Sequence, residues 1–481
     1  MPHVDIPQSR CRFALAHADI TPPDNIYHRM WGAATHERAT GIHRPLRATV
    51  ALLAPHDAAQ TDRQFLIALD HCVLGRTEMD ALLRNACACA GVPRAQCIVV
   101  FSHTHAAGLM GLERANLPGG DLIAPYLDTL AQCVGDLLAQ TLAELRPATI
   151  VYGTGRCSLA AQRDFWDAQH NVYAGGFNPG APADDMLLVA RITGTQGDTL
   201  ATLVNYACHP TTLAWGNTLI SPDYLGAMRE VMERATGAPC LFLQGASGEL
   251  GPREGFVGDV AVADRHGRQL GHAALASLEE VPAPGTRFEY AGPVVSGATI
   301  ATWQHTAVAP AQLRAHQHWT RKLWDIPLPI RPGIPTLAQV QIEQAEWTAK
   351  ETAAHAAGQL DAARDARAMA ERKRRMFHRM QQLPPGDHFP LEAIVMRLGG
   401  AVWVVLQGEF YSVLQTDLRA RFPGVPLVIA TIASHWGASY LTPRELYGKG
   451  IYQETIAIVA AGGLETVIEQ VGHEIQRQLT P

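Results

Sequence analysis

Short apolar segments without charged residues recur along the chain, and each has the length of one strand. They are Phe65 to Leu69, Cys97 to Phe101, Leu200 to Tyr206, Leu241 to Leu243, Val402 to Leu406 and Val428 to Ile432. Such segments are typical of a sheet that is covered on both faces. Between some of them lie amphipathic helical patterns, for example Tyr126 to Leu145 and Asp223 to Thr236. The alternation predicts an α/β fold of mixed α+β character.

One segment has a different pattern. From about Ala309 to Met380 the chain is rich in Ala, Gln, Glu, Lys and Arg, and a Pro-rich stretch, Pro327 to Pro335, divides it. We predict two helices in this segment, with the second one long. The helices would form an insertion over residues 309–382, a candidate lid, between the two parts of one catalytic domain, 1–308 and 383–481. Trp319 and Trp324 are expected to pack the insertion onto that domain.

A run of four basic residues, Arg372 to Arg375, lies in the second of these helices. Such a run can contact an anionic ligand, or it can form a solvated helix face that nearby Glu and Asp residues balance. We favour the solvated face.

Composition narrows the classes of protein. Of 481 residues, 47% are hydrophobic and 17% charged, which indicates a globular chain. The net charge of −6 argues against nucleic acid or an acidic membrane surface as the main partner, so we expect a small-molecule substrate. No apolar segment reaches the roughly 18 residues of a membrane span. Oligomeric state stays open, a homo-oligomer included.

Location is predicted from the N-terminus and the cysteines. Charged residues interrupt the first 20 positions, so no signal peptide is recognised there: Asp5, Arg10, Arg12 and Asp19. The nine cysteines include no CxxC pair, which favours free thiols in a reducing compartment. We therefore expect a cytoplasmic protein.

Candidate chemistry is concentrated just after the predicted strands. Histidines, a glutamate and a tyrosine follow four of the apolar segments: His103 and His105, His209, Glu409, and His435 with Tyr440. Imidazole and carboxylate together suit a cation such as zinc, and three or four such ligands leave room for an activated water. Singly, each residue has a structural alternative, such as a turn histidine. The HxHxDH pattern of metallo-β-lactamases is absent, while an amidohydrolase barrel remains a minor alternative.

Several motifs, in order along the chain, resemble the neutral ceramidase family. They are Asp19-Ile20-Thr21-Pro22, Thr40-Gly41-Ile42-His43, Ser102-His103-Thr104-His105, Asn205-Tyr206-Ala207-Cys208-His209-Pro210-Thr211, Gln244-Gly245-Ala246-Ser247-Gly248-Glu249-Leu250, Gly408-Glu409-Phe410 and Tyr440-Leu441-Thr442. The resemblance runs from about residue 13 to 470 and implies a ceramidase-like zinc hydrolase core. That family is zinc-dependent and cleaves the amide of ceramide.

The resemblance also implies roles for particular residues. The zinc ligands of the family match His103, His209, Glu409 and Tyr440. His105 would lie beside the scissile group, and Arg163 matches an arginine that holds a substrate oxygen. Tyr452 stands at the spacing of a second tyrosine near the oxyanion.

The serine nucleophile of the family is missing, because its position is Gly251 in this chain. Ser247 is four residues away, where a structural turn serine is the simpler interpretation. The family's secretion signal and C-terminal β-sandwich domain are not recognised either, so a membrane lipid is not the expected substrate.

The expected function is therefore a zinc hydrolase that uses metal-activated water on an amide, ester or lactone of a soluble substrate. His105 or Glu249 would handle protons. Two alternatives remain open: a ceramidase-type amidohydrolase with an altered nucleophile, and a non-catalytic binding protein on the same scaffold.

Overall fold

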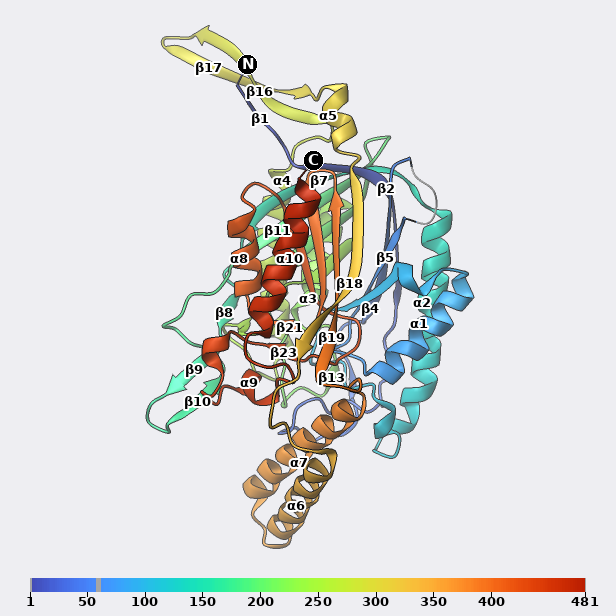
Figure 1. Ribbon diagram of the computed structural model, residues 1–481, viewed down its shortest axis with the longest axis vertical. Helices are drawn as coiled ribbons and strands as arrows, with labels where there is room; N and C mark the ends of the chain where they lie inside the picture. The colour runs from blue at the N-terminus through green and yellow to red at the C-terminus, as the bar shows by residue number, and fades with distance from the viewer. Residues whose placement is uncertain (1, 58–61, 481) are drawn as a thin grey trace.

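A single twelve-stranded sheet forms the body of the molecule (Figure 1). The computed structural model describes residues 2–57 and 62–480. The strands lie in the order β14-β12-β11-β7-β2-β4-β5-β6-β22-β20-β19-β18. Their bounds are β2 Gln8–Asp19, β4 Arg47–Ala54, β5 Gln64–Leu69, β6 Cys97–Phe101, β7 Arg146–Arg156, β11 Met186–Gly194, β12 Thr199–Tyr206, β14 Cys240–Gln244, β18 Trp319–Pro329, β19 His388–Leu398, β20 Ala401–Gln407 and β22 Leu427–Ala433.

All six predicted apolar segments are strands of this sheet, and the mixed α/β fold is confirmed. The two predicted amphipathic helices are present as α2 (Ile123–Ala143) and α3 (Tyr224–Thr236). Parallel pairs join β5 to β6, β12 to β14 and β20 to β22, so the carboxyl ends of these strands carry the loops that follow.

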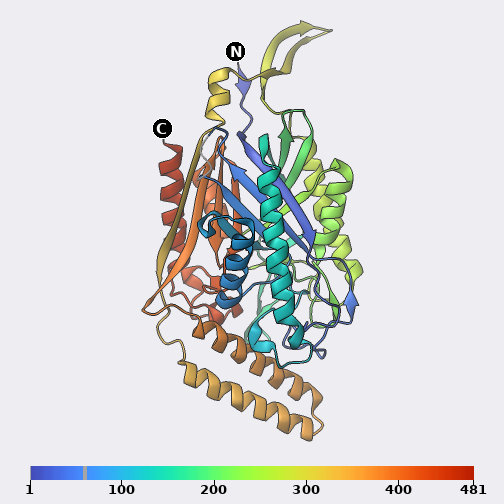
Figure 2. The same ribbon diagram turned by 90° about the vertical axis from the view of Figure 1, so that its right-hand side faces the viewer.

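Helices cover the outside of the sheet in three groups. Helices α1 (Arg76–Ala90) and α2 lie over β2, β4, β5 and β6 (Figure 2). Helices α3 and α4 (Val260–Glu279) cover β7, β11, β12 and β14. Helices α8 (Val413–Arg421) and α10 (Gly463–Leu479) pack on the strands from β18 to β22.

The other faces of the two halves of the sheet form a shared apolar core, to which strands from β2 to β22 contribute. Asn205 of β12 fastens the halves together. Its side-chain amide donates to the carbonyls of Leu243 on β14 (2.9 Å) and Ile429 on β22 (2.8 Å). Its oxygen accepts the backbone N–H of Ile429 at 2.9 Å. The buried amide is therefore fully used, as a polar group in an apolar core requires.

The predicted arrangement of residues 309–382 is partly wrong. Before the Pro-rich stretch lie a short helix, α5 (Pro310–Ala315), and the edge strand β18, and both long helices, α6 (Leu337–Ala356) and α7 (Leu360–Gln381), come after it. Strand β18 pairs with β19 along its whole length, so it belongs to the body. Trp319 and Trp324 do pack on the body, but as strand residues.

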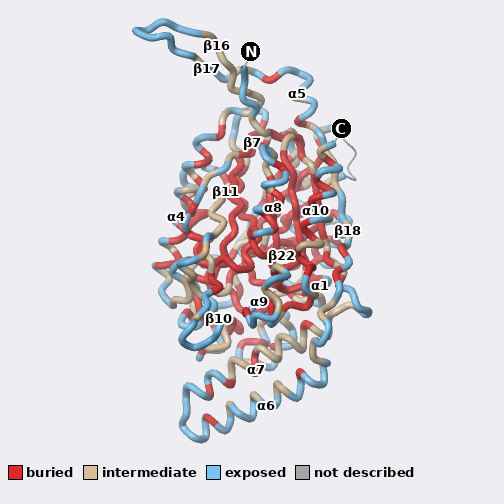
Figure 3. Tube along the Cα trace, turned by 60° about the vertical axis from the view of Figure 1, so that its left-hand side comes forward, coloured by how far each residue is buried: buried red, intermediate tan, exposed pale blue. Residues whose placement is uncertain are grey.

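The helical hairpin α6–α7 projects from one end of the molecule, where its surface is largely exposed (Figure 3). It sits within the connection between β18 and β19, whose facing residues at that end are Pro329 and His388. At the opposite end a second exposed hairpin projects, made of β16 (Thr286–Val295) and β17 (Thr299–Ala307), with β1 (His3–Val4) along its side (Figure 1).

In the described part of the chain, no helix combines the length and the apolar character that crossing a membrane requires. All nine cysteines are free thiols, and most are buried. Even the closest pair, Cys87 and Cys97, has its sulfur atoms 3.7 Å apart and unbonded.

Candidate active site

Three buried side chains from three separate strand ends converge on one point. His103 follows β6, His209 follows β12, and Glu409 begins β21 (Glu409–Phe410), just after β20. Glu409 Oε2 lies 3.2 Å from Nε2 of His103 and 3.3 Å from Nε2 of His209. One ligand atom from each of the three lies within 4.8 Å of the others. The strand ends thus bring together residues that are some 300 positions apart in sequence.

Backbone carbonyls orient both imidazoles. Nδ1 of His103 donates to the carbonyl of Cys72 at 2.8 Å, and Nδ1 of His209 donates to that of Ser247 at 2.6 Å. Each Nε2 is left to point at Glu409, with its lone pair free for a cation. The backbone of His103 has φ 68°, in the left-handed region that a histidine rarely adopts. Strain of this kind persists where surrounding structure imposes it, and it is concentrated at functional sites.

Tyr440 and Arg163 complete the centre. Tyr440 faces Glu409 directly in the two-stranded pairing of β21 with β23 (Tyr440–Leu441), and its hydroxyl lies 3.2 Å from Nε2 of His209. Arg163 donates to that hydroxyl at 3.0 Å and to the Gly248 carbonyl at 2.5 Å. It is held there by the pairing of β8 (Ala160–Gln162) with β15 (Leu250–Pro252).

His105 stands beside the cluster and carries a free nitrogen. Its ring centroid is 4.8 Å from that of His103 and 5.9 Å from that of His209. Its buried Nε2 has no hydrogen-bond partner among the described residues. On its other side lies the indole of Trp31, with centroids 5.3 Å apart.

The centre is a strongly coupled set of buried charges. Burial by itself would raise the pKa of Glu409, but His103 and His209 hold it well below its usual value. Burial would likewise lower the pKa of His103, which Cys72 and Glu409 instead raise well above the ordinary range. Burial lowers the pKa of His209 to about 3, and Arg163 adds to this effect. Burial also raises the pKa of Tyr440 well above its usual value, while Arg163 opposes that change.

The donors in this cluster fit a divalent cation. Two imidazole nitrogens and a carboxylate oxygen are aimed at one another, and Nε2 of His103 is buried without a hydrogen bond. Without a cation, such an arrangement leaves buried polar atoms unsatisfied, which costs free energy. The residues His103, His209 and Glu409 can therefore hold a metal ion, with Tyr440 beside them.

No side-chain nucleophile stands at the position that the family motif marks. Gly251 lies in β15, where an added Cβ would meet Thr211 Oγ1 at 3.5 Å and Arg163 Cδ at 3.9 Å. Ser247 is on the far side of His209, within 3.3 Å of its Nδ1, and accepts from Gln244 at 2.7 Å. Its hydroxyl therefore faces away from the Nε2 atoms around which the metal ligands gather.

Glu249, which the sequence suggested as an alternative proton carrier, binds the backbone of Ser412 instead. Both of its carboxylate oxygens accept the backbone N–H of Ser412 at 2.9 Å. Burial raises its pKa to about 7, but it does not line the pocket described next.

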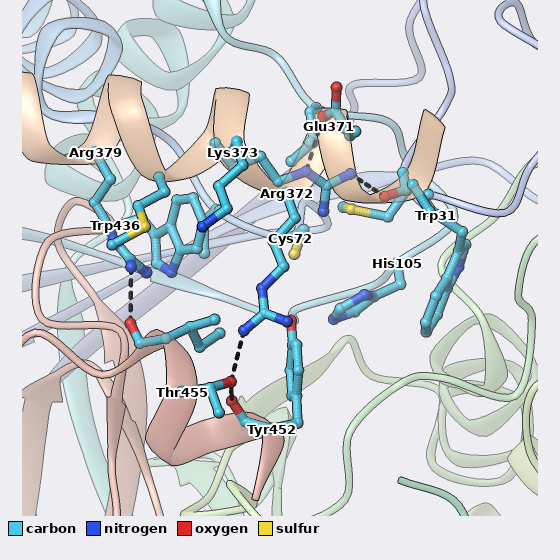
Figure 4. Close-up of a pocket in the computed structure, with 18 of the residues that line it drawn as sticks. Trp31, Cys72, His105, Glu371, Arg372, Lys373, Arg379, Trp436, Tyr452 and Thr455 are labelled. Atoms are coloured by element: carbon cyan, nitrogen blue, oxygen red, sulfur yellow. Dashed lines mark hydrogen bonds and ion pairs between the residues drawn. The ribbon is translucent and has the colours of Figure 1, made fainter. Parts of the chain in front are cut away.

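A cavity of about 550 Å³ opens over the cluster, and helix α7 forms its roof (Figure 4). His103, His105, Glu409, Tyr440 and Tyr452 contribute to its lining. The ring of Tyr452, on α9 (Tyr452–Ile456), lies 6.0 Å from that of Tyr440. From the roof, four cationic side chains line the same cavity: Arg372, Lys373, Arg375 and Arg379.

Sequence reasoning missed part of this site. The run from Arg372 to Arg375, interpreted as a solvated face, places three of its members in the pocket lining. Trp31 and Cys72 were not singled out at all. For Cys72 a signal existed, because it follows strand β5 as the predicted ligands follow theirs. Trp31 lies in a loop between β2 and β3 (Gly41–Ile42), where no periodic pattern marks it.

Among solved structures, two ceramidases share this fold. A ceramidase complexed with C2 superposes with a TM-score of 0.65 at 15% sequence identity, covering 99% of this chain and 76% of that chain. Neutral ceramidase from Pseudomonas aeruginosa gives a TM-score of 0.61 at 16% identity, covering 98% and 74% of the respective chains. No family model matches the sequence. No curated protein matches it either. The chain thus has the neutral ceramidase fold, as its motifs suggested. Sequence identities of 15% and 16% establish the fold alone.

Proposed function

We propose that the protein is a zinc-dependent hydrolase that cleaves an amide, ester or lactone bond of a small soluble substrate with metal-activated water. The observation that carries the proposal is the convergence of His103, His209 and Glu409 beside a strand position, Gly251, that has no nucleophilic side chain. A bound zinc ion would supply a nucleophile near neutral pH by lowering the pKa of water to roughly 7.

The remaining residues have separate tasks in this proposal. The carbonyls of Cys72 and Ser247 keep the ligand imidazoles in one orientation. Arg163 and Tyr452 would donate to the oxygen that becomes negative when the carbonyl is attacked, and one such donor typically contributes about 3 kcal/mol. His105, half-buried and with an Nε2 atom that is buried and has no partner among the described residues, would pass the proton to the leaving group.

Cleavage of ceramide itself is the first alternative, and it would need another nucleophile and room for two long chains. The roof formed by α7 and its cationic side chains favours a smaller, more polar substrate. A non-catalytic binding protein is the second alternative. A buried cluster of intact ligand residues argues for retained chemistry.

A substrate panel tests the proposal. Purified protein, stripped with a chelator and reconstituted with zinc, would be assayed against matched amides, esters, lactones and a short-chain ceramide. We expect turnover of at least one soluble class that requires zinc and is lost in Glu409→Gln. Absence of turnover with every member, at full zinc occupancy, would favour the binding protein.

Mass spectrometry tests the mechanism. In oxygen-18 water, a single turnover should label the product, and no acylated protein should accumulate. Ser247→Ala should keep its activity. An acyl adduct on the wild-type chain that disappears in Ser247→Ala would replace the water mechanism by a serine mechanism.

A further inference from the structure

The cationic residues of α7 differ in whether they have acidic partners. Lys373 forms an ion pair with Glu343 of α6, and Arg374 and Arg375 pair with Glu371 at 3.5 and 2.9 Å. Within the described residues, no carboxylate lies at ion-pair distance from Arg372 or Arg379. Two guanidinium groups in the pocket roof therefore lack an ion-pair partner among the described residues.

Arg379 is the more unusual of the two, because its residue is only 5% exposed. One terminal nitrogen donates to the Ile456 carbonyl at 2.7 Å, but Nε has no hydrogen-bond partner among the described residues. The guanidinium lies 5.0 Å from the ring centroid of Trp436. Burial lowers its pKa to about 10; Tyr452 and Glu409 oppose this decrease, and nearby Arg372 adds to it. A buried guanidinium without a carboxylate at ion-pair distance is costly, and an anionic ligand would offset part of that cost.

Arg372 approaches the proposed metal centre through Tyr452. Its Nη2 donates to the Thr455 hydroxyl at 2.7 Å, and its guanidinium lies 5.9 Å from the Tyr452 ring, which in turn neighbours Tyr440 (Figure 4). Both guanidiniums thus line the pocket from α7, and the Tyr452 ring lies between Arg372 and the predicted ligand Tyr440.

Another wall of the cavity is aromatic: Trp31 and Trp215 line it, and both contact Phe256. The rings of Trp31, Trp215 and Phe256 contact one another, with centroids 5.6 to 6.4 Å apart. Trp31 also adjoins His105, so this wall continues down to the centre. An apolar group of a bound molecule can lie here while a polar group reaches the roof.

We propose that Arg372 and Arg379 form a subsite for an anionic group, so that the substrate is an amphiphilic acyl compound with a carboxylate, sulfate or phosphate on one part and an apolar acyl or aryl group on the other. Calling the bound molecule a substrate rests on the proposed hydrolase function. Binding of an anion at the subsite does not depend on turnover. Guanidinium groups suit such anions because their planar N–H donors match two oxygens at once.

Binding to metal-free protein isolates the subsite from the predicted metal. Calorimetry on chelator-treated protein would compare 1-octanesulfonate with neutral 1-octanol, because a sulfonate stays charged and coordinates metals weakly. We expect the wild type to bind the sulfonate at least tenfold more tightly than the alcohol. Arg372→Gln and Arg379→Met should each remove most of this preference, and Arg379→Lys should restore part of it.

Arg374→Gln is the matched control, since Arg374 is on the same helix but outside the pocket lining, and its sulfonate affinity should stay within twofold of wild type. Arg372 is only half-buried, so Arg372→Gln stays informative if the Arg379 variants do not fold. Equal affinity for sulfonate and alcohol in the wild type, or an unchanged preference in Arg372→Gln, would overturn the subsite.

Turnover separates this result from the proposed function. With zinc restored, an N-acyl compound bearing a carboxylate should be cleaved at least tenfold more efficiently than its neutral carboxamide analogue. Sulfonate binding without any turnover would refute the hydrolase and leave the subsite standing. Turnover without a charge preference would refute the subsite and leave the hydrolase.

Discussion

His209 is the residue on which the predicted metal centre depends most, because it is wholly buried and contacts both Glu409 and Tyr440. We expect His209→Ala to reduce the metal content from about one ion per chain to a small fraction, since the incomplete set of His103, Glu409 and Tyr440 should bind zinc weakly. Inductively coupled plasma mass spectrometry on dialysed protein measures this directly.

His272→Ala is the control for that experiment, because His272 is an exposed residue of α4 remote from the centre. It should keep the wild-type metal content. Full occupancy in His209→Ala would show that the ion binds elsewhere, for instance at the second possible group, Cys72 with His103 and His105.

The convergence of His103, His209 and Glu409 could be predicted from sequence because each follows an apolar strand within three residues, and strand ends of one sheet tend to meet. Arg372 and Arg379 could not be assigned in this way. Whether a charged side chain on a helix has a partner depends on residues far away in sequence, such as Glu343 for Lys373 or Arg114 for Glu371. No local pattern distinguishes a paired helix cation from a free one.

At the scale of elements, α7 docks onto the body through a very close backbone approach at Gly32. A Cβ at this position would come within 2.8 Å of Ala368 Cβ and 2.9 Å of Ala368 Cα. We expect Gly32→Ala to destabilise the docked helix by about 1–3 kcal/mol, as overpacked contacts do. Limited proteolysis should then cut the α6–α7 hairpin faster than in the wild type.

Gly175→Ala is the control for Gly32→Ala, because nothing lies within 4 Å of the Cβ it would add. It should leave proteolysis unchanged. Equal cleavage rates for Gly32→Ala and the wild type would mean that α7 adjusts without loosening.

A buried ion cluster is the second attachment of α7. Glu371 binds Arg114 of the body at 2.8 Å and Arg375 of its own helix at 2.9 Å. Burial alone would raise the pKa of Glu371, but Arg375 and Arg114 lower it from 4.5 to about 2. Because the folded-state pKa lies below the unfolded one, the stabilisation is present above pH 4.5 and disappears as the pH falls towards 2.

Glu371→Gln should therefore lower the free energy of unfolding by about 3 kcal/mol at pH 7, because it removes the buried carboxylate charge that Arg114 and Arg375 share. Urea unfolding at a series of pH values measures this, and the difference from wild type should shrink below pH 4.5. Glu346→Gln, at an exposed position of α6, should have no such effect. A difference that stays constant down to pH 2 would contradict the assigned pKa.

The edge strand β18 shows why element boundaries around this hairpin were mispredicted. Its sequence contains Thr, Arg, Lys and Asp between the tryptophans and Ile326, and this polar content suggested a helix. Pairing with β19 determines its conformation instead, since only one of its edges needs a partner. The central strands are apolar on both faces, so their sequences predict strand structure more clearly than the sequence of β18 does.

At the scale of the whole molecule, the predicted metal ligands come from both halves of the sheet. His209 follows β12 in one half, whereas Glu409 follows β20 in the other. A metal that binds only the folded chain should stabilise it by about 4 kcal/mol at a free concentration one thousand times its dissociation constant. We expect the unfolding temperature to fall by several degrees on chelation and to return when zinc is added back.

Differential scanning fluorimetry with EDTA and then excess zinc measures this effect, and His209→Ala should make the protein insensitive to both. If the unfolding temperature of the wild type does not change although chelation has removed the metal, the ion does not link the two halves.

The position of α6 and α7 between Pro329 and His388 has a consequence for how the chain can diversify. Because strand pairing already brings those two ends together, lengthening or replacing the segment between them adds little closure entropy. Each doubling of a flexible loop costs only about 0.6 kcal/mol. The roof can therefore be exchanged in evolution or by engineering if the replacement keeps the packing at Gly32 and an acidic partner for Arg114, with new substrate preferences introduced above an unchanged set of predicted metal-binding residues.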